Sequence, residues 1–288
     1  MSRTSEIKLF RSTYKNWVSV ARDYHSRKPK IESHFRSGVK EALNLEEVFL
    51  INRYIETGKD ARDALKLVKN CEVPFEGRIL KIGGDLNGFT IFETFIREDY
   101  KGINVKDKLV LDIGANIGDT AIYFAIHGAK KVISLEPFPN LFRIAKENVI
   151  GNGFEDTVQL LNAGYGKGSE IVLEESLKGE AGSQLRASKT GSTIKLFTLK
   201  ELIKEFGITD AVLKIDCEGC EYDLLSEENE SLKRFSDVQI EYHYGFKVLV
   251  EKLKDSGFQV NFTDPFEIFN KAAINSKMEV GFIYAKRK

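Results

Sequence analysis

The residues best placed to do chemistry begin at a glycine-bearing turn, residues 112–118, which directly follows a short apolar run. Gly114 can turn the chain sharply because it has no side chain, and Gly118 allows the next segment to pack closely. Three residues separate these glycines, whereas the dinucleotide-binding fingerprint separates its glycines by one residue and then by two. Asp112 places a carboxylate where a pyrophosphate would be repelled. The turn therefore predicts a small ligand that carries positive charge.

A second acid, Glu136, stands at the end of the next predicted strand. A carboxylate at that place can accept hydrogen bonds from both hydroxyls of a ribose. S-adenosylmethionine combines a ribose with a cationic amino-acid end, so Asp112 and Glu136 together predict this cofactor. The competing interpretation is a glycine turn followed by an acid that caps a helix.

Four charged residues follow a later apolar run: Lys214, Asp216, Glu218 and Glu221. On a strand, Lys214 and Asp216 share one face. One cation among three acids offsets their mutual repulsion and can lower carboxylate pKa values. An acidic wall of this kind suits a positively charged sulfonium, although a structural ion cluster at a strand end would have the same composition.

Methyl transfer from a sulfonium is a displacement in which the protein mainly aligns the reactants. A neutral hydroxyl is a weak nucleophile, so a general base is expected. Glu241 and His243 share one face at the end of a predicted strand, and His243 is the predicted base because histidine titrates near neutral pH. Asp216 or Glu218 is the alternative base, and a packing histidine is the competing interpretation. The predicted catalytic residues are His243, Asp216, Glu218, Lys214 and Glu241.

The elements that must position these residues alternate along the chain. From residue 109 onward, short apolar runs typical of buried strands alternate with helical patterns. This order predicts an α/β fold with a mostly parallel sheet and helices on both faces. The predicted strands are 109–113, 132–135, 158–162, 211–215, 238–242, 259–262 and 280–284, the predicted helices are 120–127, 141–149, 199–206 and 246–256, and an extra hairpin is expected from 170–173 and 193–197.

The first part of the chain predicts a helical extension. Apolar and aromatic residues from Phe10 to Tyr24 recur at helical spacing, and Asn44 and Asp60 can cap two further helices. A hairpin is predicted next, with strands at 78–82 and 89–92 joined by a glycine turn at 83–88. The predicted domains are a helical extension over 1–72 and a second domain over 73–288, divided into a hairpin lead-in (73–100) and a catalytic core (101–288).

Three segments resemble a known family. They are residues 111–120 (LDIGANIGDT), 132–139 (VISLEPFP) and 213–221 (LKIDCEGCE), and over about residues 75–285 the chain resembles class I methyltransferases, more narrowly the FkbM-type methyltransferase family. The third segment is the most family-specific, although Cys217 and Cys220 stand where the family often has small apolar residues. The resemblance implies a Rossmann-like seven-stranded sheet, S-adenosylmethionine as cofactor, and methylation of a hydroxyl oxygen. The cofactor contacts implied are Asp112, Gly114, Ala115, Asn116, Gly118, Asp119, Glu136, Pro137, Asn162, Ala163 and Asp216.

The predicted function is S-adenosylmethionine-dependent methylation of a hydroxyl on a sugar, lipid or secondary metabolite. An RNA or protein N-methyltransferase is the alternative, but base methylation often uses an Asn/Asp-Pro-Pro-aromatic motif where this chain has Asp-Cys-Glu-Gly at 216–219. The glycine spacing disfavours a nicotinamide-dependent oxidoreductase, and the retained acids disfavour a non-catalytic binding module. Nothing in the sequence identifies the acceptor.

Composition sets the remaining expectations. The 288 residues are 42% hydrophobic and 30% charged with zero net charge, which is typical of a soluble globular protein and gives no global attraction to nucleic acid or membrane. A cytoplasmic location is expected because no signal peptide or long apolar stretch is present. Residues 1–40 are rich in Lys and Arg, so this helical region can contact an acidic surface or dock on the catalytic domain. Nucleic acid is not an expected partner, and the sequence does not indicate the oligomeric state.

Three cysteines, an odd number, do not predict a disulfide framework. Cys217 and Cys220 have the spacing of half a zinc site, but no second pair accompanies them, so no metal is expected. Cys71 is expected to pack in the protein interior.

Overall fold

The protein is described here by a computed structural model over residues 3–84, 89–173, 183–269 and 277–287. The chain divides into two compact units, Met1–Asp99 and Tyr100–Lys288. The domain boundary expected at residue 72 lies inside the first of these units. Asn87 and Gly88, part of the glycine turn expected in the lead-in hairpin, lie outside the described residues.

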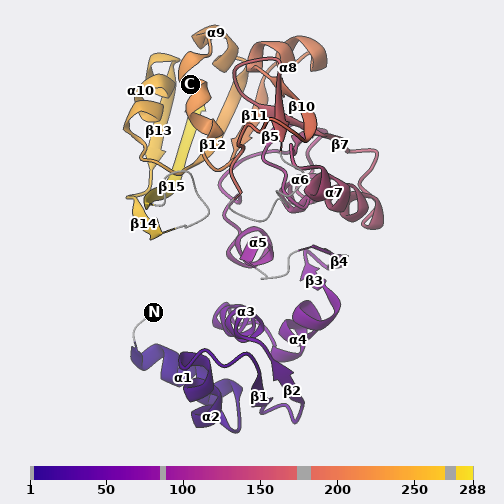
Figure 1. Cartoon of the computed structure of the whole chain (residues 1–288), viewed down its shortest axis with the longest axis vertical. Coiled ribbons are helices and arrows are strands. Elements are labelled where there is room, and N and C mark those ends of the chain that lie inside the picture. Colours follow the sequence, from indigo (N-terminus) through magenta and orange to yellow (C-terminus); the bar gives the residue numbers. More distant parts are fainter. Residues whose placement is uncertain (1–2, 85–88, 174–182, 270–276, 288) are drawn as a thin grey trace. The chain divides into compact units, whose positions relative to one another are not determined.

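The second unit is built on one large sheet (Figure 1). Its strands run in the order β13-β15-β12-β11-β5-β6-β7, and β14 pairs with β15 beside this path. Adjacent strands from β12 to β7 are parallel, whereas β15 is antiparallel to both β12 and β13. The seven-stranded, mostly parallel sheet expected from the sequence is therefore confirmed. The bounds are β5 Leu109–Ile113, β6 Lys131–Leu135, β7 Val158–Leu161, β11 Ala211–Ile215, β12 Phe235–Tyr242, β13 Phe258–Phe262, β14 Phe266–Phe269 and β15 Lys277–Arg287.

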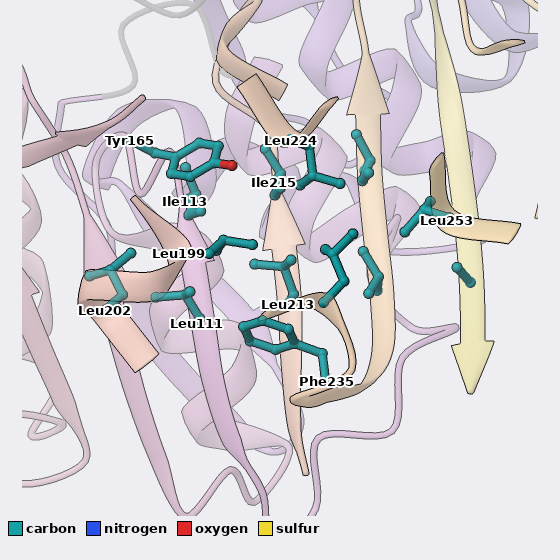
Figure 2. Close-up of a cluster of buried hydrophobic side chains, with 14 of the residues drawn as sticks. Leu111, Ile113, Tyr165, Leu199, Leu202, Leu213, Ile215, Leu224, Phe235 and Leu253 are labelled. Carbon is teal, nitrogen blue, oxygen red and sulfur yellow. The ribbon is translucent and has the colours of Figure 1, made fainter. Parts of the chain in front are cut away.

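Helices connect these strands, as the alternating pattern predicted. Those of the second unit are α6 Asp119–Ile126, α7 Pro139–Gly151, α8 Leu199–Phe206, the 3-10 helix η2 Cys220–Ser226, α9 Asn229–Leu232 and α10 Lys247–Asp255. Sheet residues that alternate along β5 and β11, such as Leu111, Ile113, Leu213 and Ile215, share one face with Leu199 of α8 in a buried cluster (Figure 2). This core fixes the positions at which the strands of the sheet end.

A small second sheet contains the expected extra hairpin. Its order is β8-β10-β9, with β8 Ala163–Tyr165, β9 Glu170–Leu173 and β10 Ser192–Phe197. β9 and β10 are antiparallel, as predicted, while β10 is parallel to β8.

The first unit contains more strand than the sequence predicted. Its elements are α1 Arg3–Thr13, α2 Trp17–His25, β1 Ile31–His34, β2 Lys40–Leu43, α3 Leu45–Glu56, α4 Ala61–Asn70, β3 Glu72–Phe75, β4 Arg78–Lys81, α5 Phe89–Ile91 and a π-helix at Phe92–Arg97. The capping expectations are confirmed, because the side chain of Asn44 accepts from the Glu47 N–H and that of Asp60 from the Arg62 N–H. The single helix expected around residues 10–24 is wrong, since Tyr14 pairs with Phe35 between α1 and α2.

The lead-in hairpin is also placed differently from the prediction. β4 pairs with β3, which precedes it, and the run at 89–92 is helical. Glu76 and Gly77 both have positive φ, the conformation of the two-residue turn that joins antiparallel strands. The sequence pattern does not indicate β3, because Pro74 stands within that strand and proline is disfavoured there.

Within the described residues, no helix is both long enough and apolar enough to span a bilayer.

Candidate active site

The turn between β5 and α6 depends on two glycines in the left-handed region. Gly114 has φ +85°, and a β-carbon there would lie 1.7 Å from the carbonyl oxygen of Asp216. Gly118 has φ +82°, and its β-carbon would lie 3.1 Å from the backbone of Ala145 in α7. The turn thus runs directly against the end of β11, and α6 begins close to α7. These are the backbone roles that the sequence analysis assigned to both glycines.

Beneath this turn lies a buried ion pair between neighbouring strands. Lys214 Nζ is 3.1 Å from Asp112 Oδ1 and donates to the Gly114 carbonyl at 2.7 Å. Asp112 Oδ2 accepts from the hydroxyls of Thr120 (2.9 Å) and Ser134 (3.0 Å). Both charged side chains are almost completely excluded from solvent. The pair therefore connects the turn between β5 and α6 to β11, and the expected contact of Asp112 with the cofactor stays a prediction.

Lys214 remains charged despite its burial. Burial acts to lower the pKa of Lys214, but the negative charges of Asp112 and Asp216 outweigh it, so the pKa is raised. The charged ammonium of Lys214 therefore holds the turn in place through Asp112 and the Gly114 carbonyl. Its predicted catalytic role stays a prediction.

Glu136 gathers several of the predicted cofactor residues around its carboxylate. Oε2 accepts the N–H of Asn116 at 2.8 Å, and Oε1 accepts the N–H of Phe138 at 2.9 Å. The side-chain amide of Asn162 donates to the carbonyls of Glu136 (2.9 Å) and Pro137 (3.1 Å). When Glu136 is ionised, each carboxylate oxygen keeps a second lone pair, as needed to accept a ribose hydroxyl. The remaining predicted contacts Ala115, Asp119 and Ala163 are buried in the same region.

The burial of Glu136 has a consequence for folding. Burial raises the pKa of Glu136 to about 8, although the N–H groups of Phe138 and Asn116 act in the opposite direction. An acid whose folded pKa exceeds its ordinary value of 4.5 contributes stability that is complete below that value and is lost as pH rises through about 8.

We therefore expect Glu136→Gln to remove part of the pH dependence of stability. Glutamine leaves the N–H of Asn116 or Phe138 without an acceptor, which costs about 1–3 kcal/mol near pH 4.5. The free energy of unfolding of the natural protein should then fall towards pH 8 more steeply than that of the variant. Denaturant unfolding at both pH values, with the exposed Glu147→Gln as control, measures this. Parallel pH profiles would contradict the assignment.

Three carboxylates surround His243 at the ends of β11 and β12. His243 Nδ1 lies 3.0 Å from Glu221 Oε1, and Nε2 lies 3.3 Å from Glu218 Oε2 and 3.9 Å from Asp216 Oδ1. We call Asp216, Glu218, Glu221 and His243 the acidic cluster. The structure thus brings together three predicted catalytic residues, whereas the predicted Glu241 is half-buried in β12 opposite Phe282.

The charge of His243 changes the choice among the predicted bases. Burial acts to lower the pKa of His243, but Glu221, Glu218 and Asp216 raise it well above 6.5. The ring is therefore protonated on both nitrogens at neutral pH and has no lone pair that can accept a proton. This favours the alternatives that the sequence left open, Asp216 or Glu218.

Glu218 has the properties of a base that works near neutral pH. Burial raises its pKa to about 7, with His243 acting to lower it and Asp216 and Glu221 to raise it further. Its side chain is 24% exposed, so an acceptor can reach it. Asp216 is held differently, because its Oδ2 accepts the hydroxyl of Tyr100 at 3.2 Å.

Cys217 and Cys220 form a disulfide that brackets Glu218, with a Cα–Cα distance of 5.5 Å. The expectation of no disulfide was wrong, because the left-handed backbone of Glu218 and Gly219 turns the chain back so that the two sulfurs meet. The expectation that Cys71 packs inside is also wrong, because this residue is free and exposed at the left-handed end of α4.

Asp216, Glu218 and His243 each offer one potential ligand atom, and these atoms lie within 4.8 Å of one another. A divalent cation could occupy this position only by displacing the Nε2 proton of His243. Because the protonated ring already supplies positive charge between the carboxylates, we assign no metal here.

Sequence reasoning missed several polar and aromatic residues beside the cluster. The Gln184 amide donates to the Tyr244 hydroxyl at 2.5 Å, and the Tyr244 N–H donates to the Tyr222 hydroxyl at 2.8 Å. Gln184 and Tyr244 both approach Gly219. Single tyrosines outside any motif, including Tyr100, carry no signal in one sequence.

A model of the FkbM methyltransferase domain matches residues 112–264. Uncharacterized protein 158B of Sulfolobus islandicus rod-shaped virus 1 is 29% identical over 136 residues, which cover 47% of this chain and 63% of that protein. Protein arginine N-methyltransferase 1 of Saccharomyces cerevisiae is 45% identical over 56 residues, 19% of this chain and 16% of that enzyme. The chain thus spans less than two thirds of the length of either relative.

Among solved structures, precorrin-6y C5,15-methyltransferase of Geobacter metallireducens GS-15 aligns with a TM-score of 0.36 and 15% identity, covering 63% of this chain and 82% of that chain. TrmK of M. capricolum, in complex with S-adenosyl-homocysteine, aligns with a TM-score of 0.39 and 15% identity, covering 63% of each chain. The assignment rests on the family match, which spans more than half of the 288 residues and includes the glycine turn, Glu136 and the acidic cluster. The chain therefore belongs to the FkbM methyltransferase domain family, whose cofactor is S-adenosylmethionine.

Proposed function

We propose that this chain transfers a methyl group from S-adenosylmethionine to a hydroxyl oxygen of a sugar, lipid or secondary metabolite. The observation that carries the proposal is the position of the acidic cluster beside the cofactor turn. The carbonyl of Asp216 lies against Gly114, so the carboxylates that follow β11 stand next to the turn that cradles the cofactor.

The residues present fit this cofactor. Gly114 lets the turn lie directly against the carbonyl of Asp216, where a β-carbon would not fit, and Glu136 keeps lone pairs for the ribose hydroxyls. When bound, the cofactor supplies an electrophilic methyl group on a positively charged sulfur. The negative charge of Asp216 favours a cation at that position.

The protein must align the acceptor and remove its proton. As the new carbon–oxygen bond forms and the carbon–sulfur bond breaks, the hydroxyl proton passes to the carboxylate of Glu218. A pKa of about 7 makes Glu218 partly ionised at neutral pH and strong enough as a base to take the proton. The charged His243 ring fixes Glu218 from one side, and Glu221 holds that ring from the other.

We expect Glu218→Gln to lower turnover by about 10²–10⁴-fold, the usual contribution of a general base. Its affinity for S-adenosylmethionine, measured by calorimetry, should change little because the turn and Glu136 are intact. Transfer of a labelled methyl group to sugars, glycolipids and polyphenols identifies the acceptor class, with RNA and arginine-containing peptides in parallel. Glu230→Gln, an exposed acid on α9, is the matched control.

Normal turnover in Glu218→Gln would contradict the role of this base. A product methylated on nitrogen would instead support an N-methyltransferase, the alternative that the sequence left open. Failure of the natural protein to bind S-adenosylmethionine would overturn the proposed function as a whole.

A further inference from the structure

We propose that the Cys217–Cys220 disulfide is a positioning element that holds the carboxylate of Glu218 against His243, and that thiol–disulfide exchange releases it. The consequence for turnover rests on the proposed function, whereas the positioning itself does not.

The disulfide encloses only two residues, and both have unusual backbones. Glu218 has φ +57° and Gly219 has φ +127°. A side chain other than that of glycine is disfavoured in the left-handed region. The disulfide fixes the chain on both sides of Glu218, so the backbone cannot leave this region by moving one end alone. A reduced loop lacks that restraint.

The conformation held in this way determines a specific contact. Glu218 Oε2 lies 3.3 Å from His243 Nε2, while Glu221 Oε1 lies 3.0 Å from Nδ1 and Asp216 Oδ1 is 3.9 Å from Nε2. Asp216 is held outside the loop, where it accepts from Tyr100. Glu221 accepts the N–H of Gly219 inside the loop, but it also accepts the backbone N–H of His243 at 3.0 Å, which the disulfide does not hold. Release of the loop should therefore remove the charge of Glu218 from the ring, while Glu221 keeps its contact with His243.

The chemistry is an exchange with an external dithiol. Its thiolate attacks one sulfur of the Cys217–Cys220 bond, a mixed disulfide forms, and its second thiol then displaces the protein sulfur. The two cysteines gain two electrons and two protons, and the dithiol becomes a disulfide. Both cysteines are partly exposed, so the reagent can reach them.

The titration of His243 tests the proposal without an acceptor. A Cys71→Ser background removes the free thiol, so that only the pair responds to dithiothreitol. The four histidines of the chain give separate proton NMR titrations, and His243→Gln assigns the relevant one. Reduction is expected to lower the pKa of His243 by about one, a tenfold change in the proton-binding constant. The other three histidines should titrate as before.

Glu218→Gln separates positioning from a general loosening of the structure. In this variant the oxidised protein should already show the lower titration, and reduction should change it no further. Cys217→Ser with Cys220→Ser should reproduce the reduced form without a reductant, and reoxidation should restore the original titration in the natural protein. An unchanged His243 titration on reduction, or an equal change in Glu218→Gln, would overturn the proposal.

The same samples keep this proposal distinct from the proposed function. Calorimetric binding of S-adenosylmethionine is expected to be alike in the oxidised and reduced proteins, because Gly114 and Glu136 lie outside the bracketed loop. Absence of cofactor binding in both forms would reject the methyltransferase function and leave the titration result standing.

Discussion

Gly114→Ala is expected to abolish measurable binding of S-adenosylmethionine and to lower the free energy of unfolding by about 3 kcal/mol or more. Two effects add. The residue has φ +85°, and its β-carbon would lie 1.7 Å from the backbone oxygen of Asp216. Because the obstacle is backbone at the end of a central strand, no side-chain rotation can relieve the overlap. Either the turn or β11 must move, and both adjoin the proposed cofactor contacts.

A matched control separates the overlap from the backbone strain. Gly257 has φ +91° in the same unit, and nothing lies within 4 Å of the place where its β-carbon would stand. Gly257→Ala should cost only the strain, about 1–2 kcal/mol, and leave calorimetric cofactor affinity unchanged. Equal losses in the two variants would show that the close approach of Gly114 to β11 is unimportant.

The sheet could be predicted because each of its strands has a local signature. β5 and β11 are short apolar runs followed at once by polar or glycine residues, the pattern of strands buried on both faces. Their order along the chain then determines parallel pairing through intervening helices. The glycine turn between β5 and α6 was predictable for a related reason, since glycine spacing is a property of consecutive residues.

The sequence could predict which residues come together in the acidic cluster, but not their charge states. Its residues come from the segment after β11 and from the end of β12, so their proximity follows from the fold, but their charge states depend on distances of a few ångströms. His243 appeared suited to be a base from its residue type alone, whereas three surrounding carboxylates raise its pKa and keep it protonated. The disulfide was missed for a similar reason, because it requires positive φ at Glu218, which no sequence pattern indicates.

The ion pair between Lys214 and Asp112 shows what the sequence could not reveal about a residue's role. In sequence, Lys214 stood among acids and suggested catalysis. In the sheet, Lys214 and Asp112 are direct partners across β11 and β5, and the ammonium also holds the Gly114 carbonyl. Pairing between strands that are distant in the chain thus gives Lys214 a structural role in holding the glycine turn, and its catalytic role stays a prediction.

Lys214→Met is expected to destabilise the protein by about 3–5 kcal/mol, because it leaves the carboxylate of Asp112 buried without its counter-charge. Methionine preserves most of the side-chain volume, so the loss reports charge and hydrogen bonding more than packing. Thermal or denaturant unfolding measures it. Lys200→Met, which removes a pair with Glu228 on the exposed surface, should change stability by only about 0–1 kcal/mol.

A second substitution distinguishes an unpaired charge from a general packing defect. In the Lys214→Met background, Asp112→Asn removes the isolated charge, and its amide oxygen can still accept from Thr120 and Ser134. The double variant should therefore be more stable than Lys214→Met alone, although Asp112→Asn by itself destabilises the natural protein. Additive losses would mean that the two side chains contribute separately. Recovery would show that the turn between β5 and α6 is anchored to β11 by a charge pair that is stable only when both partners are present.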